Sequence, residues 1–249
     1  MELLKLMLSR RWIVATLIVV SVMAIFVRLG IWQLDRLEQR RAQNAQLVAV
    51  LEGEPLNLPE DEPPTDIELL ENRDVIVSGT YDFEHQKLLI LQTWGGRNGA
   101  NLITPLVLAD GQTAVLIDRG WIPDAELNAD NIATMYNQTT SATIQGYVAL
   151  PQILSRQAAN TESVRPENEI YRVDTNALGD SIPYELYDFY IVEPPAANDL
   201  EAFPYHKTRI IDLSEGPHLS YAIQWFLFAL VLAVLHPIFV RRRSRATAN

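Results

Sequence analysis

Histidine is the residue type whose placement in this sequence could do chemistry. The four histidines are His85, His206, His218 and His236. Their spacing does not match a metal-binding motif such as H-E-x-x-H. The chain has no cysteine that could add a thiolate ligand. His218 stands out because a long apolar run begins directly after it. An imidazole there could be a cofactor ligand, a proton carrier or an incidental polar cap.

Two apolar runs predict two transmembrane helices. The run from Trp12 to Val27 is free of charge and continues past Arg28 to residue 34, and the run 219–240 is also uncharged. A bilayer core requires about 20 apolar helical residues. We therefore expect spanning helices over 12–34 and 218–240. Helix-forming residues follow the first run, so that helix should continue to about residue 51.

The distribution of charge predicts the orientation in the membrane. Residues 1–40 carry a net charge of +3, residues 41–217 of −18, and residues 218–249 of +4. Basic residues favour the cytoplasmic side. The N-terminus (1–11) and the basic tail (241–249) should thus be cytoplasmic in a multi-pass protein of a bacterial plasma membrane. Four arginines oppose this rule: Arg28, Arg36, Arg40 and Arg41. The strongly acidic middle segment argues against a nucleic-acid partner.

The exported segment has the pattern of a β domain. Residues 52–72 hold four prolines and eight acidic residues without a base, which predicts an acidic, proline-rich linker. Polar loops are expected over 155–169 and 194–206. Within 73–217 we expect a mainly antiparallel β domain, as a sandwich or open barrel. Its short runs rich in β-branched and aromatic residues are 74–83, 87–93, 102–108, 113–122, 142–148, 170–174, 188–193 and 207–213.

Four sequence blocks occur together in a recognisable order. They are LGIWQLDRLEQR (29–40), RDVIVSGTYD (73–82), NLITPLVLADGQTAVLIDRGWIP (101–123) and PHLSYAIQWF (217–226). In order, spacing and membrane flanks, the sequence resembles the Surfeit-locus family of cytochrome oxidase assembly factors. The resemblance extends from about residue 12 to residue 240.

The resemblance implies a function that composition could not reveal. Family members assist the biogenesis of haem–copper oxidases, and bacterial members resemble carriers of haem a. Such a carrier would receive haem a from its biosynthesis enzyme and present it to the catalytic subunit of the oxidase. The family's proposed haem-linked histidine matches His218. The resemblance implies an assembly factor and not an enzyme. The alternatives are a scaffold that holds oxidase subunits without touching haem and, less consistent with a lone histidine, a membrane-bound oxidoreductase.

Further candidate residues lie around this histidine and in the β domain. On a helix, Tyr221 and Trp225 share a face with His218, and this face suits a flat ring. His236 shares it too but lies roughly 27 Å deeper, too far for the same iron. Each of the other candidates could instead be structural. Those on the first helix, which could complete a pocket, are Trp32, Gln33 and Arg36, and those in the β domain are Arg119, Gly120 and Trp121.

Overall fold

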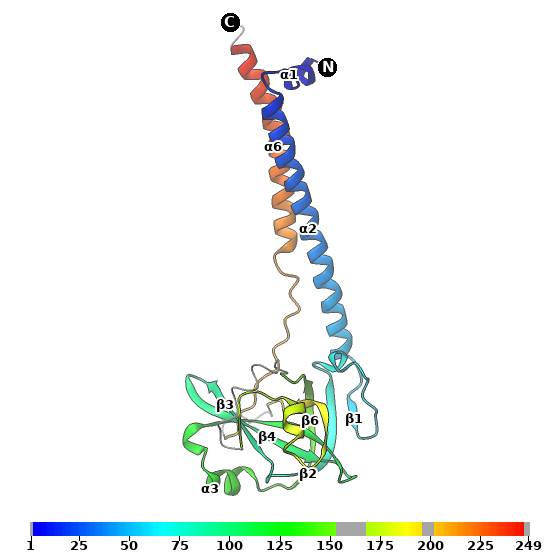
Figure 1. The fold of residues 1–249 in the computed structure, drawn as a ribbon, viewed down its shortest axis with the longest axis vertical. Helices are drawn as coiled ribbons and strands as arrows, with labels where there is room; N and C mark the ends of the chain where they lie inside the picture. The colour runs from blue at the N-terminus through cyan, green and yellow to red at the C-terminus, as the bar shows by residue number, and fades with distance from the viewer. Residues whose placement is uncertain (1, 153–167, 196–201, 247–249) are drawn as a thin grey trace. The chain divides into compact units, whose positions relative to one another are not determined.

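The computed structural model describes residues 2–152, 168–195 and 202–246. It divides the chain into two compact units, residues 1–46 with 212–249 and residues 47–211. The first unit contains the long helices and the second a β domain (Figure 1). The β domain therefore begins well before residue 73, where the sequence predicted it to start.

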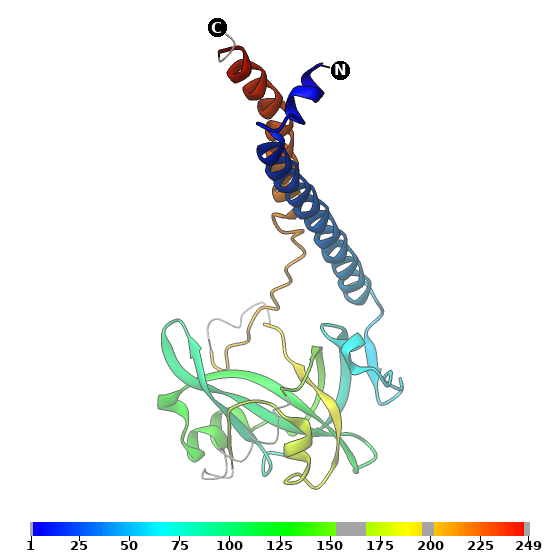
Figure 2. The same ribbon diagram turned by 45° about the horizontal axis from the view of Figure 1, so that its top comes forward.

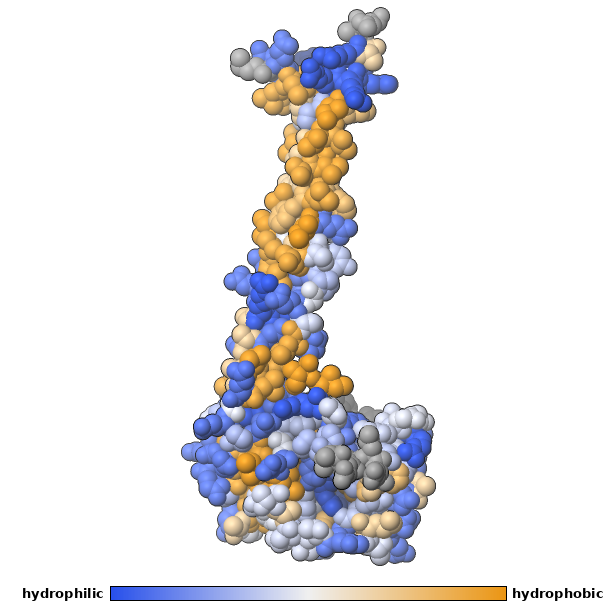
Figure 3. All heavy atoms as spheres, turned by 180° about the vertical axis from the view of Figure 1, so that it is seen from behind, coloured by the Kyte–Doolittle hydropathy of each residue, from blue (hydrophilic) through white to orange (hydrophobic). Residues whose placement is uncertain are grey.

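Two long helices dominate the first unit. Helix α2 spans Ile13–Leu51 and helix α6 spans His218–Ala246, while a short helix α1 covers Glu2–Met7. Both α2 and α6 are long and apolar enough to cross a membrane. An apolar band covers the pair, with hydrophilic residues beyond each end (Figure 3). The predicted continuation of the first helix to about residue 51 is confirmed. The second helix continues beyond its predicted end and includes the arginines 241–243 and 245.

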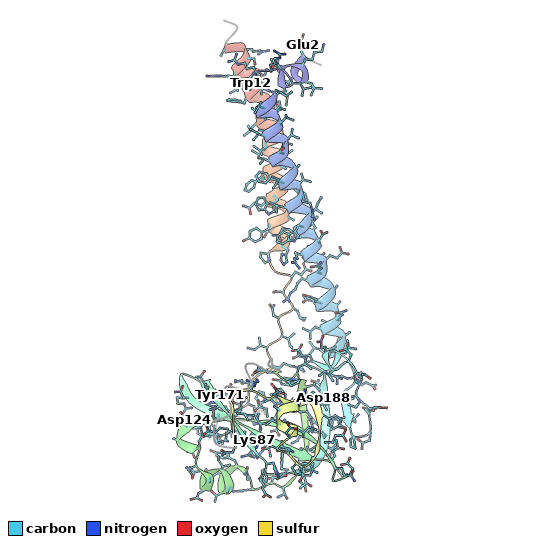
Figure 4. The ribbon with its side chains drawn as sticks, viewed as in Figure 1. Glu2, Trp12, Lys87, Asp124, Tyr171 and Asp188 are labelled. Atoms are coloured by element: carbon cyan, nitrogen blue, oxygen red, sulfur yellow. The ribbon has the colours of Figure 1, made fainter. Side chains whose placement is uncertain are left out.

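Helices α2 and α6 lie side by side in both ribbon views (Figures 1 and 2). The buried Gly30 of α2 faces Phe226 of α6, and a Cβ atom at residue 30 would lie 2.6 Å from that ring. At the other end of the pair, Trp12 donates a hydrogen bond to Ser244 (3.2 Å). Figure 4 shows Trp12 near Glu2, at the end of the pair where α6 finishes. The helices are thus antiparallel, and the close approach at Gly30 depends on the missing side chain.

Replacing Gly30 by alanine should destabilise the helix pair. The new methyl group would overlap the Phe226 ring, and overpacking of this kind typically costs about 1–3 kcal/mol. Thermal unfolding of the full chain in detergent should show the loss. Adding Phe226→Ala to Gly30→Ala should recover part of it, because the smaller side chain removes the overlap. A Gly30→Ala variant as stable as the wild type would show that the helices can separate here without cost.

The β domain is a ring of five strands with extensions. Strand β2 pairs with β6, β6 with β8, β8 with β5, β5 with β4, and β4 returns to β2. Two residue pairs make the closing contact between β2 and β4, so the sheet forms a barrel rather than a sandwich. The strands are β1 (Leu56–Leu58), β2 (Asp74–Tyr81), β3 (Lys87–Trp94), β4 (Arg97–Val107), β5 (Thr113–Pro123), β6 (Ser141–Ala149), β7 (Glu169–Ile170) and β8 (Glu185–Val192).

The sheet is mainly, but not wholly, antiparallel. Among the described residues, β1–β2, β3–β7 and β5–β8 pair in parallel, and the other five pairings are antiparallel. The expected fold class, two terminal apolar helices flanking a mainly antiparallel sheet domain, is confirmed. In the pair β1–β2, the connection 59–73 returns the chain in the same direction, as a parallel pair requires.

The central strands supply the core of the β domain. In β2, alternate residues such as Val75 and Val77 are buried, which is the pattern of a strand with one buried face. Strands β4 and β5 are buried along nearly their whole length because side chains pack on both faces. Short helical segments complete the domain: Ile67–Leu70, Asp124–Glu126, α3 (Ala129–Asn131), Ile132–Tyr136 and α5 (Thr175–Gly179).

Three details differ from the sequence predictions. The segment 52–72 is not a fully solvated linker, because Leu56, Leu58 and Leu70 are buried in the barrel core. The run 170–174 is a strand only at its start, since Asp174 caps α5 by accepting a hydrogen bond from Ala177 N–H. The run 207–213 is not a strand. Most of the expected loop 155–169, and residues 196–201 of the second, lie outside the described residues.

Candidate functional site

His218 is the first residue of α6 and contacts Gln33 of α2. Its Nδ1 atom lies 2.9 Å from Oε1 of Gln33. Gly216 and Pro217 precede it, and Gly216 adopts φ +67°, a conformation that favours glycine. His218 is half-buried, whereas Tyr221, one turn further along α6, is 47% exposed. The imidazole thus lies at an accessible helix end but is held by α2.

The helix face predicted to receive a flat ring packs largely against α2. Ala222 and Ala229 are buried, and Trp225 lies against Phe26 with ring centroids 5.4 Å apart. Further along, His236 Nε2 lies 3.0 Å from the hydroxyl of the buried Thr16. That this face receives a flat ring therefore stays a prediction, and part of the face already packs against α2. On this face His218 and Trp225 are half-buried, Tyr221 is exposed, and Ala222 and Ala229 are buried.

The candidates on α2 separate into two groups. Trp32 is 43% exposed, and the guanidinium of Arg36 lies 5.8 Å from its ring centroid. Arg36 also donates to the side chain of Gln39. Among the described residues, Gln33 alone of Trp32, Gln33 and Arg36 forms a hydrogen bond to α6. Trp32 and Arg36 instead contact each other on the exposed side of α2.

A second set of α2 side chains holds the segment that leads into α6. Arg41 forms two hydrogen bonds to the carboxylate of Glu215, at 2.7 and 2.9 Å. Arg40 bonds both the backbone and the carboxylate of Asp212, and Asn44 donates to the carbonyl oxygen of Leu213 (2.7 Å). The sequence analysis missed this contact. Its signal was a basic stretch on α2 matched by the acids of DLSEG (212–216).

Arg119 has a structural environment within the β domain. Its guanidinium lies 4.7 Å from the ring centroid of Tyr81 and 5.2 Å from that of Phe83. It donates to the carbonyl oxygen of Tyr136 and the side chain of Asn137. Burial lowers the pKa of Arg119. These contacts occupy the guanidinium and join β5 to the segments packed over it.

Gly120 and Trp121 fasten a later segment to β5. Gly120 has φ +99°, and a Cβ atom there would lie 3.0 Å from the carbonyl oxygen of Tyr205. Trp121 is fully buried and exchanges two backbone hydrogen bonds with Tyr205, each 2.8 Å long. The RGWIP block therefore has a structural explanation. His218 and Gln33 come together in one unit, while Arg119, Gly120 and Trp121 belong to the other.

Asp118 is a buried carboxylate beside this block. Asn101 donates to both of its oxygens, at 3.0 and 2.8 Å, and Gly120 N–H donates at 3.0 Å. Asp118 and Arg119 have different partners, as expected for neighbours on opposite faces of a strand. Asp118 and Asn101 line a polar cavity of about 290 Å³. Burial raises the pKa of Asp118 above its ordinary value.

The substitution Asp118→Asn should make the stability of the β domain less dependent on pH. The pKa of Asp118 is higher in the folded protein than in the unfolded chain, so protonation of this carboxyl favours folding. Its contribution to the free energy of unfolding is fully present below the unfolded pKa and is lost as the pH rises through the folded pKa. Thermal unfolding of the full chain in detergent, followed by near-ultraviolet circular dichroism from about pH 4 to pH 8, should show a smaller decline for the variant.

Asp110→Asn is the matched control for that experiment. A backbone hydrogen bond from Thr113 lowers the pKa of Asp110, so its contribution has the opposite sign and is lost towards acid pH. Coincident pH profiles for wild type and Asp118→Asn would contradict the assignment of a raised pKa to Asp118.

The arrangement suits ligation by one imidazole. Among the described residues there is no group of three or more His, Cys, Asp or Glu side chains that could hold a metal ion. A haem needs only axial ligands from the protein, because the macrocycle supplies the other four. His218 at an accessible apolar helix end fits this requirement.

Fold and site together define a protein class with two apolar terminal helices, a β barrel between them in the sequence, and an imidazole at the start of the second helix. The SURF1 family model matches residues 20–230, and the chain belongs to this family. A SURF1-like protein of Monosiga brevicollis is 28% identical over 90% of this chain and 86% of its own length. A SURF1-like protein of Rickettsia felis is 25% identical over 90% of this chain and 96% of its own length. The yeast cytochrome oxidase assembly protein SHY1 is 32% identical over 41% of this chain and 26% of its own length.

Proposed function

We propose that this protein is an assembly factor for a haem–copper oxidase and that it carries haem a on His218. Membership of the SURF1 family and the similarity to the yeast cytochrome oxidase assembly protein SHY1 support the oxidase connection. The observation that carries the haem proposal is the position of His218, half-buried at the mouth of an apolar helix and held by Gln33. The protein acts as a carrier and not as an enzyme.

The residues around His218 can hold an apolar, iron-containing cargo. His218 would supply the iron ligand, and the aromatic side chains of Tyr221 and Trp225 would offer apolar surface on the following turns. When haem is bound, its iron would accept the lone pair of an imidazole nitrogen, and this bond would give the haem a defined orientation. Tyr221 is exposed and available for such a contact, whereas Trp225 already packs against Phe26 of α2.

The proposed partners follow from the chemistry of delivery. Haem a is poorly soluble in water, so a carrier must receive it from the biosynthesis enzyme and release it to the catalytic subunit of the oxidase without exposing it to solvent. Both transfers would take place at the bilayer. The acidic middle segment disfavours nucleic acid.

A scaffold without haem is the second candidate. The hydrogen bond between Gln33 and His218 and the close contact at Gly30 hold α2 and α6 together. A scaffold that binds oxidase subunits needs this packing and nothing more. The two candidates differ in whether the imidazole is required for ligand binding or only for helix packing.

We further propose that both termini are cytoplasmic and that the β domain lies outside a bacterial plasma membrane. The contact between Trp12 and Ser244 supports this orientation, because it brings the basic residues at the start of α2 and the end of α6 to the same end of the helix pair. Basic residues favour the cytoplasmic side.

The orientation can be tested with reporter fusions. A reporter fused after Arg243 should be active on the cytoplasmic side, and one inserted at Gly111, in an exposed turn of the β domain, should be active on the opposite side. A reporter pair consisting of alkaline phosphatase and a fluorescent protein distinguishes the two compartments. The same compartment for both positions would exclude a two-span topology.

The substitution His218→Ala should abolish most haem binding. Alanine is a good helix former, so α6 and its insertion should survive while the nitrogen ligand is lost. Absorbance of protein purified from cells that make haem a should show a sharp fall in bound haem. Oxidase activity in the host should fall in parallel.

His236→Ala is the matched control. Thr16 still donates its hydroxyl hydrogen to the carbonyl oxygen of Met7 (3.1 Å), so removing His236 leaves that hydroxyl with a partner. This variant should keep most of its haem. If His218→Ala retains full haem at equal expression, the imidazole is not the ligand, and the scaffold function takes its place.

A further inference from the structure

The contact with Gln33 determines which nitrogen of His218 is available. The Gln33 oxygen, 2.9 Å from Nδ1, can only accept a hydrogen bond, so Nδ1 of the neutral imidazole carries the hydrogen. The lone pair then resides on Nε2. No described residue forms a hydrogen bond to Nε2 of His218.

A second observation concerns the space beside Nε2. A Cβ atom built on Gly216 would lie 3.4 Å from Cδ2 and 3.5 Å from Nε2 of His218. Gly216 is exposed and has φ +67°. The glycine therefore turns the chain into α6 without placing a side chain against the Nε2 edge of the ring. A larger side chain at residue 216 would lie against this edge of the imidazole, from which we expect the haem to approach.

The position of Gln33 depends on the helix packing. Gly30 lies one turn before Gln33 on α2, and its missing side chain allows the close approach of α6. The amide can thus span from α2 to the first residue of α6. The hydrogen bond to His218 is a polar contact at this end of the helix pair, and the contacts of Trp12 with Ser244 and of Thr16 with His236 lie further along it.

We propose that Gln33 is a positioning residue that fixes the tautomer and orientation of His218, so that Nε2 is the atom that ligates haem iron. This inference rests on the proposed haem-carrier function. Partners of this kind orient the metal-bound ring, and their loss typically lowers metal affinity 10- to 100-fold. The ligand class is a metalloporphyrin with one free axial position on iron.

The test compares Gln33→Leu and Gln33→Glu with wild-type full-length protein titrated with haemin in detergent. Leucine removes the acceptor without opposing membrane insertion, and the affinity should fall by roughly tenfold or more. Glutamate can accept but cannot donate, so it should retain binding. Because a carboxylate partner makes the imidazole more basic, the reduction potential of the bound haem should be lower in Gln33→Glu than in wild type.

Gly216→Asn tests the access to Nε2. Asparagine tolerates positive φ better than other residues with a Cβ, so it fills the space beside Nε2 with less backbone strain than another side chain would cause. Haem affinity should fall. Gly111→Asn, at another positive-φ glycine whose Cβ would contact nothing within 4 Å, should leave it unchanged.

The outcomes separate this inference from the proposed function. If His218→Ala keeps wild-type haem affinity, the proposed function fails. If His218→Ala loses haem but both Gln33 variants keep the wild-type affinity and potential, only the positioning role is wrong. Loss of binding in Gln33→Glu equal to that in Gln33→Leu would also overturn it, because an acceptor at residue 33 would then not be sufficient.

Discussion

The close approach of α2 and α6 at Gly30 is the constraint on which the site depends. Two helices meet at short range only where one of them lacks a side chain, and here the Phe226 ring takes that space. This contact fixes the relative position of residues 185 places apart in the chain, Gln33 and His218. A single imidazole does not by itself determine how its ring is oriented at the site. Its orientation comes from the packing one turn away.

The chain between β8 and α6 is restrained by different means at its two ends. At one end, Trp121 of β5 pairs with Tyr205 through two backbone hydrogen bonds, and only a glycine at residue 120 allows the approach. At the other end, Arg41 and Asn44 hold residues 213–215. Backbone hydrogen bonds and paired charges make these contacts, and at the first end the Tyr205 ring also stacks on the buried Trp121 ring, with centroids 6.1 Å apart. The contacts of Arg41 and Asn44 hold the residues that lead into α6.

Composition and periodicity predicted the parts of the fold that depend on local sequence. Long apolar runs predicted α2 and α6, and short runs rich in β-branched and aromatic residues predicted β2 to β6. Strand β1 could not be predicted in this way, because three residues among prolines and acids become a strand only through parallel pairing with β2. Residues 207–213 have a strand composition but no pairing partner in the sheet. The contact between Gln33 and His218 joins distant residues, so no local pattern could reveal it.

The pairing of Arg40 and Arg41 also bears on the orientation in the membrane. Counted as free charges, these arginines oppose cytoplasmic termini, since they follow the first apolar run. In the structure Arg40 pairs with Asp212 (3.2 Å) and Arg41 with Glu215 (2.7 Å). The hydrogen bond from Arg41 lowers the pKa of Glu215, so that pair stays charged at neutral pH. Paired in this way, they add little net positive charge at this end of α2. Arg28 and Arg36 still oppose cytoplasmic termini, but described basic residues at the opposite end, such as Arg10 and Arg241, are not in an ion pair and favour them.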